Sequence, residues 1–126
     1  MTSLRQTRLR LSRRRDIIDE ALEDFVQKRM TGAQAPAMTL AREVLLGGGK
    51  RFRPILALLA YEAAGGKNND EVMDLALSAE LIHTATLVHD DIYDFAKTRR
   101  GKPTLHANYG LAQGIIGGDY LFVLGF

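Results

Sequence analysis

Two aspartates near residue 90 have the spacing of a metal-binding pair. Asp90 and Asp94 are four residues apart, and on a helix this spacing places both carboxylates on one face, about one turn from each other. Like charges at this spacing are mildly destabilising, and the apolar run before them predicts that both are desolvated, which favours a bound cation. Carboxylates on a rigid scaffold suit Mg²⁺, which keeps several waters and takes further ligands from substrate phosphates. The string DDIYD is also typical of a solvated helix end, so it predicts a metal site only together with other groups.

A glycine-rich turn ahead of a helix predicts an anion site. The three glycines at positions 47–49 are followed by three cations, Lys50, Arg51 and Arg53. Glycine lets the backbone approach a ligand closely, and the helix that Pro54 would open adds the positive end of its dipole. A nucleotide-binding P-loop does not fit, because Val44 stands where a glycine is required and Arg51 where Ser or Thr is required. A turn of this kind is also common as the C-cap of the preceding helix.

Two further features carry groups that bind phosphates. The segment 99–104, RRGKPT, places Arg99 and Arg100 five to six residues after Asp94, within reach of whatever the aspartates hold, and guanidinium groups bind phosphates in a bidentate manner. His83 precedes Asp90 by seven residues, which is two turns along the same face, and it could donate to a phosphate. A lone histidine or a lone charged loop is more typical of a core residue or a solvated surface. Together, however, the paired carboxylates, the cationic turn and the arginine loop predict a site for two polyanions.

Helical periodicity predicts that these groups lie on an all-α scaffold. An amphipathic helix is predicted around 17–26, a short helix at 39–46, a nearly all-apolar central helix at 55–64 and a long helix at 71–95. A polar loop is expected over 96–104, and a last apolar helix runs from 111 to the end. Because an apolar helix needs neighbours to cover it, residues 1–126 are interpreted as the N-terminal part of one larger helical domain whose C-terminal part is absent.

Composition limits the class of protein. The chain has no cysteine, so neither a disulfide nor a thiolate metal site can form. Six arginines precede the first acidic residue, Asp16, and make 1–15 a basic arm. We interpret this arm as a solvated helix start; contact with an anionic membrane or nucleic acid and a mitochondrial transit peptide are alternatives. No secretory leader or bilayer-spanning segment is expected, which favours a cytoplasmic protein. Membrane contact is expected to be peripheral at most, and no nucleic-acid partner is expected.

Four segments resemble the motifs of the trans-polyprenyl diphosphate synthase family: GGGKRFRP (47–54), ELIHTATLVHDDIYD (80–94), RRGKPT (99–104) and GGDYLF (117–122). They occur in the family's order and leave only the first 40 or so residues outside the resemblance. The resemblance implies an antiparallel helical bundle of the isoprenoid synthase type around a deep cavity, usually as a homodimer. It also implies the Mg²⁺-dependent, head-to-tail condensation of isopentenyl diphosphate with an allylic prenyl diphosphate.

The resemblance further implies roles for individual residues. The allylic diphosphate and Mg²⁺ would be held by the aspartate motif, Asp90, Asp91 and Asp94, with Asp90 and Asp94 as direct metal ligands and Arg99 on the allylic diphosphate. Isopentenyl diphosphate would be bound by four residues, Lys50, Arg53, His83 and Arg100. Ala85 and Thr86 occupy the positions before the motif that help to set product length in the family. Because both are small, a product of about twenty carbons or more is expected, since each added isoprene gains apolar burial.

The family has a second aspartate-rich motif further along its chain, which binds additional Mg²⁺, and this chain ends before it. The chain alone is therefore expected to be inactive. Two other interpretations stay open. A class I terpene cyclase also uses an aspartate-rich helix and magnesium but needs no isopentenyl site, and a non-enzymatic subunit could dimerise with a complete synthase.

Overall fold

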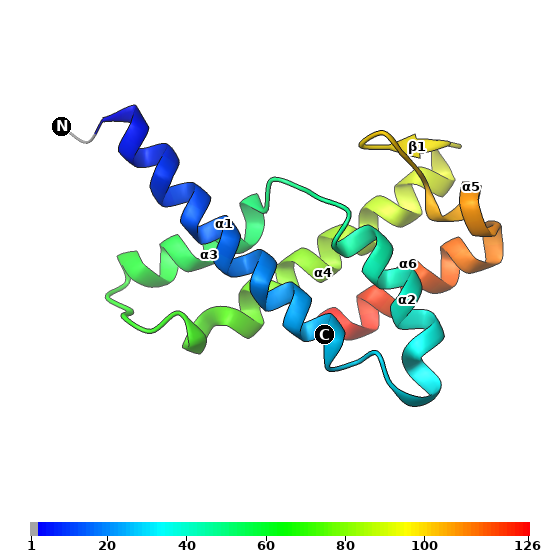
Figure 1. Ribbon diagram of the computed structural model, residues 1–126, viewed down its shortest axis with the longest axis horizontal. Coiled ribbons are helices and arrows are strands. Elements are labelled where there is room, and N and C mark those ends of the chain that lie inside the picture. The colour runs from blue at the N-terminus through cyan, green and yellow to red at the C-terminus, as the bar shows by residue number, and fades with distance from the viewer. Residues whose placement is uncertain (1–2) are drawn as a thin grey trace.

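The computed structural model describes residues 3–126, which fold almost entirely into helices (Figure 1). In chain order the elements are α1 (Leu4–Gln27), a 3₁₀ turn η1 (Gly32–Gln34), α2 (Ala35–Leu45), α3 (Phe52–Ala63), α4 (Asp70–Tyr93), β1 (Thr98–Arg99), β2 (Lys102–Pro103), α5 (Leu105–Tyr109) and α6 (Leu111–Gly125). The all-α prediction is confirmed, with one small antiparallel hairpin added. None of the described helices combines the length and the hydropathy needed to cross a membrane.

Helix α1 buries one face over its C-terminal half. The buried side chains recur at every fourth position and are fully enclosed: Ile18, Leu22 and Val26. The N-terminal half extends away from the other helices (Figure 1), so the described part of the basic arm is an exposed, regular helix. Arg14 is an exception, because its guanidinium pairs with Glu62 of α3.

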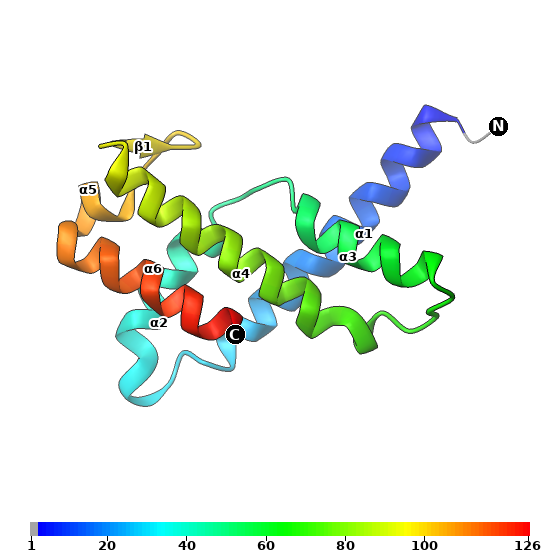
Figure 2. The same ribbon diagram turned by 180° about the vertical axis from the view of Figure 1, so that it is seen from behind.

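Helix α4 is the central element, with α3 and α6 packed along it (Figure 2). It starts with two acidic residues in its first turn, which stabilise the positive end of the helix dipole, and contains no glycine or proline. Its buried row follows the helical period and consists of Val72, Ala76, Leu77, Glu80, Leu81, Thr84, Ala85, Val88 and Asp91. Two carboxylates, Glu80 and Asp91, therefore lie in a row that is otherwise largely apolar.

Glycines bring α6 unusually close to α4. A Cβ atom on Gly118 would lie 2.2 Å from His89 Nε2, and one on Gly125 would lie 2.6 Å from Ile82 Cγ1. Because Gly118 meets a late position of α4 and Gly125 an earlier one, the two helices run antiparallel. The GGDYLF segment thus serves, within this chain, to fix α6 against the helix that carries the aspartates.

Several boundaries differ from the sequence prediction, among them the start of α1 at Leu4 rather than at 17 and the start of α3 at Phe52 rather than at 55. Helix α2 starts at Ala35 rather than at 39, because Pro36 occupies its first turn, where the missing N–H costs nothing. The expected loop at 96–104 contains the β1–β2 hairpin, in which Thr98 pairs with Pro103 and Arg99 with Lys102. Its turn residues, Arg100 and Gly101, have φ of 53° and 75°, the left-handed values of a tight hairpin turn. The separate short helix α5 then precedes α6.

Candidate functional site

The four residues expected to bind isopentenyl diphosphate line one pocket. Lys50 comes from the turn just before α3, Arg53 from the first turn of α3, His83 from α4 and Arg100 from the hairpin turn. Together they border a pocket of about 450 Å³. Lys50 and Arg53 are exposed, and neither makes an ion pair with any carboxylate of residues 3–126. The pocket therefore presents uncompensated positive charge beside the N-terminus of α3, which adds its own partial positive charge.

The glycine turn lets Arg100 close one side of this pocket. The Arg100 guanidinium donates a hydrogen bond to the carbonyl oxygen of Gly48. A Cβ atom on Gly49 would lie 3.3 Å from Arg100 Nη2, and Gly49 itself has φ of 148°. Because L side chains rarely adopt that φ, glycine is needed both for the course of the turn and for the approach of Arg100. The turn is therefore part of the site as well as the end of α2.

His83 is half-buried in the same pocket, and its surroundings favour the neutral imidazole. Burial lowers the pKa of His83 most, the nearby Arg53 lowers it further, Glu80 opposes this shift, and Arg100 and Arg99 lower it again. In the neutral form, which these surroundings favour, the ring offers one N–H donor. A bound diphosphate would reverse part of the effect, since an anion favours the protonated ring.

The three aspartates of DDIYD fall into two groups. Asp91 is buried, with 6% of its surface exposed, and its carboxylate accepts hydrogen bonds from Arg99 Nε at 2.9 and 3.0 Å and from Nη2 at 2.8 Å. The Asp91 hydrogen bonds raise the pKa of Arg99 above its ordinary value. Asp90 and Asp94 are exposed. The expectation that both are desolvated is wrong, because the desolvated aspartate is Asp91, which continues the buried row of α4.

Asp90 and Asp94 have the chemistry of a magnesium-binding pair. The Asp94 N–H still donates to the Asp90 carbonyl at 2.8 Å, so the helical turn that places them on one face is intact. Within residues 3–126, neither carboxylate has an ion pair. No group of three or more His, Cys, Asp or Glu side chains among the described residues is arranged to hold a metal by itself. Two hard oxygen ligands with open coordination positions fit an ion that completes its shell with water and phosphate.

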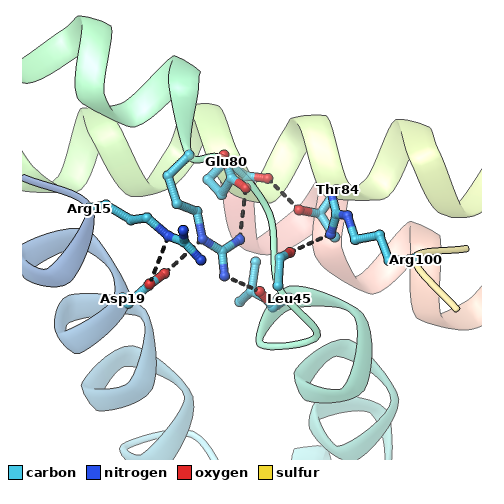
Figure 3. A network of polar contacts seen from close by, with 8 residues as sticks. Arg15, Asp19, Leu45, Glu80, Thr84 and Arg100 are labelled. Carbon is cyan, nitrogen blue, oxygen red and sulfur yellow. Dashed lines mark hydrogen bonds and ion pairs between the residues drawn. The ribbon is translucent and has the colours of Figure 1, made fainter. Parts of the chain in front are cut away.

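Arg51 is oriented differently from the sequence prediction. It was grouped with Lys50 and Arg53 as a cation for an anion, but its guanidinium is buried and contacts Asp19 and Glu80, two carboxylates that Figure 3 labels. Neither carboxylate was assigned a role from the sequence. The burial of Glu80 could be predicted from its spacing, because it lies four residues before Thr84 in the buried row of α4.

The two positions linked to product length do not line the pocket that Lys50, Arg53, His83 and Arg100 border. Ala85 is fully buried in the core. It shares a row of α4 with Ile82 and His89, the residues that meet the glycines of α6. Thr86 is half-buried, and its hydroxyl donates to the His83 carbonyl at 2.6 Å. Their effect on product length stays a prediction.

Comparison with known proteins gives one consistent family. A family model described as polyprenyl synthetase matches residues 35–126. The all-trans-nonaprenyl-diphosphate synthase (geranyl-diphosphate specific) of Rhodobacter capsulatus is 39% identical over 106 residues, which are 84% of this chain and 33% of that protein. The octaprenyl diphosphate synthase of Escherichia coli (strain K12) is 46% identical over 83 residues, 66% of this chain and 25% of that protein. The chain thus spans about a third or less of the length of these relatives.

Solved structures share the arrangement of helices. The polyprenyl synthase from Caulobacter crescentus CB15, complexed with calcium and isoprenyl diphosphate, matches with a TM-score of 0.80 and 38% identity over 93% of this chain and 35% of that chain. The match corresponds to the N-terminal portion of the isoprenoid synthase helical fold, as the motifs at 47–54 and 80–94 predicted. The chain belongs to the polyprenyl synthetase family.

Proposed function

We propose that this chain carries the two diphosphate sites of a trans-prenyl diphosphate synthase, which joins isopentenyl diphosphate to an allylic prenyl diphosphate. The observation that carries the proposal is the convergence of Lys50, Arg53, His83 and Arg100 on one pocket, apart from the exposed pair Asp90 and Asp94. A single-substrate enzyme would need only the aspartate pair, whereas a condensation needs a place for each diphosphate.

In the first site, this chain's residues bind and orient isopentenyl diphosphate. Lys50, Arg53 and Arg100 supply charge-assisted hydrogen bonds, and the neutral His83 adds one N–H donor. Holding the diphosphate here directs the isopentenyl double bond toward the allylic carbon, and such positioning lowers the entropic part of the barrier.

In the second site, Asp90 and Asp94 would hold Mg²⁺, and the ion would supply charge stabilisation to the allylic diphosphate as that group departs. Asp91 keeps Arg99 directed toward the same end of α4 through a bidentate contact, in which Arg99 Nε donates to Oδ2 and Nη2 donates to Oδ1. The remaining Arg99 N–H groups are available to the leaving group. The carbon–oxygen bond of the allylic diphosphate breaks, and the isopentenyl double bond forms the new carbon–carbon bond. The adduct then loses a proton to the released inorganic diphosphate, and no protein nucleophile takes part in the reaction.

Finer features belong to the same proposal. The small side chains of Ala85 and Thr86 favour a product of about twenty carbons or more, because nothing large at those positions stops apolar burial of the growing chain. A homodimer is proposed on the resemblance alone.

Turnover with and without isopentenyl diphosphate tests the proposal. The protein expressed from its own gene is incubated with geranyl diphosphate, radiolabelled isopentenyl diphosphate and Mg²⁺, and the dephosphorylated products are separated by chromatography. We expect labelled products that require both substrates. Products formed from the allylic diphosphate alone would indicate a terpene cyclase, and the absence of any product would favour a non-enzymatic subunit; either result contradicts the proposal.

A further inference from the structure

The Arg51 guanidinium lies at a buried junction of three helices. Its Nε donates to Asp19 Oδ1 of α1 at 2.8 Å, its Nη1 to Glu80 Oε1 of α4 at 2.9 Å, and its Nη2 to the Leu45 carbonyl at the end of α2 at 2.8 Å. The Arg51 and Glu80 side chains are 3% and 5% exposed. Figure 3 shows Asp19, Leu45 and Glu80 converging on this point.

Fold stability alone does not account for such a junction. Removing two charges from water costs so much that well-packed apolar residues in place of a buried ion pair often give equal or greater stability. Arg51 also has φ of 56°, a left-handed conformation that is unfavourable for a residue with a side chain. A strained backbone conformation persists only where surrounding contacts hold it in place. Here the three hydrogen bonds of the Arg51 side chain hold it.

The location of the junction indicates what it fixes. Arg51 lies between Lys50 and Phe52, the first residue of α3, and its φ sets the direction in which the chain leaves the glycine turn. Lys50 and Arg53, on either side, both border the pocket. Glu80 is one turn before His83 on α4, and its carbonyl accepts the Thr84 hydroxyl at 2.8 Å (Figure 3). The junction therefore joins the backbone that presents the two cations to the helix that presents the histidine.

We propose that Arg51 is a positioning residue for the isopentenyl diphosphate site, which it aligns through the buried contacts to Asp19, Glu80 and the Leu45 carbonyl. This inference rests on the proposed function and deepens it. Arg51 also neutralises the Glu80 carboxylate, which borders the same pocket and would otherwise repel a diphosphate. Loss of Arg51 should therefore weaken isopentenyl diphosphate binding and leave the allylic site at the far end of α4 unaffected.

A double substitution separates positioning from folding. Arg51→Met alone leaves Glu80 buried without a partner and is expected to unfold easily. Arg51→Met combined with Glu80→Met removes both charges and fills the space with apolar side chains, so the fold is retained and no new negative charge faces the pocket. A change in affinity in this variant reports on the course of the turn. Arg14→Met is the matched control, because Arg14 also joins α1 to α3 through one carboxylate, Glu62, but does not border the pocket.

Titration calorimetry measures the affinity of the protein expressed from its own gene for isopentenyl diphosphate and, separately, for geranyl diphosphate with Mg²⁺. A thermal melt of each variant measures its stability. The double variant should keep a cooperative melt. It should bind isopentenyl diphosphate at least about 10-fold more weakly than wild type, which is the effect of losing one charge-assisted hydrogen bond. Its affinity for geranyl diphosphate should stay within about twofold of the wild-type value. Arg14→Met should change neither affinity. Unchanged isopentenyl diphosphate affinity, or an equal loss for both ligands, would overturn the inference alone. A wild-type protein that binds no isopentenyl diphosphate would overturn the proposed function itself.

Discussion

Three neighbouring aspartates should respond in opposite ways to the same substitution. Asp90→Ala and Asp94→Ala should remove most of the turnover and leave stability almost unchanged, because both side chains are exposed and have no ion pair within residues 3–126. Asp91→Ala should lower stability, because its carboxylate is buried and accepts three hydrogen bonds from Arg99. The contrast follows from one helical turn, in which Asp91 faces the core and the other two face outward.

The expected magnitudes follow from burial. Breaking a fully buried ion pair costs about 3–5 kcal/mol, but the Arg99 side chain is 40% exposed and regains water when Asp91 is removed, so we expect a loss of about 2 kcal/mol in the free energy of unfolding. For Asp90 and Asp94, relief of like-charge repulsion changes stability by only about 0.2–0.5 kcal/mol. Loss of a metal ligand should lower turnover at least about 100-fold, or about 2.7 kcal/mol in the activation free energy.

Urea unfolding and the two-substrate turnover assay, in excess Mg²⁺, measure both quantities on the protein expressed from its own gene. Asp74→Ala is the matched control, since Asp74 is an exposed aspartate on the same helix away from the motif, and it should change neither quantity. If Asp90→Ala or Asp94→Ala keeps more than about a tenth of wild-type turnover, the assignment of metal ligands is wrong. If Asp91→Ala is as stable as wild type, the argument from its burial is refuted.

Three further changes test other parts of the site. Gly49→Ala should weaken isopentenyl diphosphate binding by about 10-fold. The alanine Cβ would lie 3.3 Å from the Arg100 guanidinium, and the φ of 148° at this position strains an L-residue. Wild-type affinity in calorimetry would contradict this. The pKa of His83 is lowered in the folded protein, so the unfolded chain binds the proton more readily. The wild type should therefore lose stability relative to His83→Gln as the pH falls below about 6.5. If the melting temperatures of the two proteins change in parallel from pH 7.5 to 5.5, His83 does not titrate as argued. Thr86→Phe should shorten the product, as chromatography of the dephosphorylated chains would show. It is a better probe than Ala85→Phe, because a phenylalanine at the fully buried position 85 would overpack the core at a cost of about 1–3 kcal/mol. Unchanged product length in Thr86→Phe would refute the role of this position.

Much of the fold and the site could be predicted from the sequence because both depend on local spacing. The 3.6-residue period predicted the main helices, and it placed Asp90 and Asp94 on one face, as the intact turn at their backbone shows. The residue types of the glycine turn and the arginine loop predicted that the two segments bind anions, and anion binding by them stays a prediction. The structure then brought Lys50, Arg53, His83 and Arg100 to one pocket.

The parts that could not be predicted depend on contacts between distant residues. Nothing in GGGKRFRP distinguishes Arg51 from its neighbouring cations, because its orientation depends on a left-handed φ and on Asp19 and Glu80, 32 and 29 residues away in the sequence. The burial of Asp91 was open to prediction, since it follows Val88 by three residues in the buried row of α4. The apolar run before the motif predicted burial of Asp90 and Asp94 instead, because burial was inferred from the preceding residues and not from the helical phase of each aspartate.

The central claim is that this chain holds two diphosphates in two separate places. The most direct test is a crystal structure of the protein expressed from its own gene, with isopentenyl diphosphate, an unreactive thio-analogue of geranyl diphosphate, and Mg²⁺. We predict that one diphosphate contacts Lys50, Arg53, His83 and Arg100, and that Mg²⁺ joins the other to Asp90 and Asp94. Both diphosphates at the aspartate pair, or a metal bound away from Asp90 and Asp94, would contradict the account.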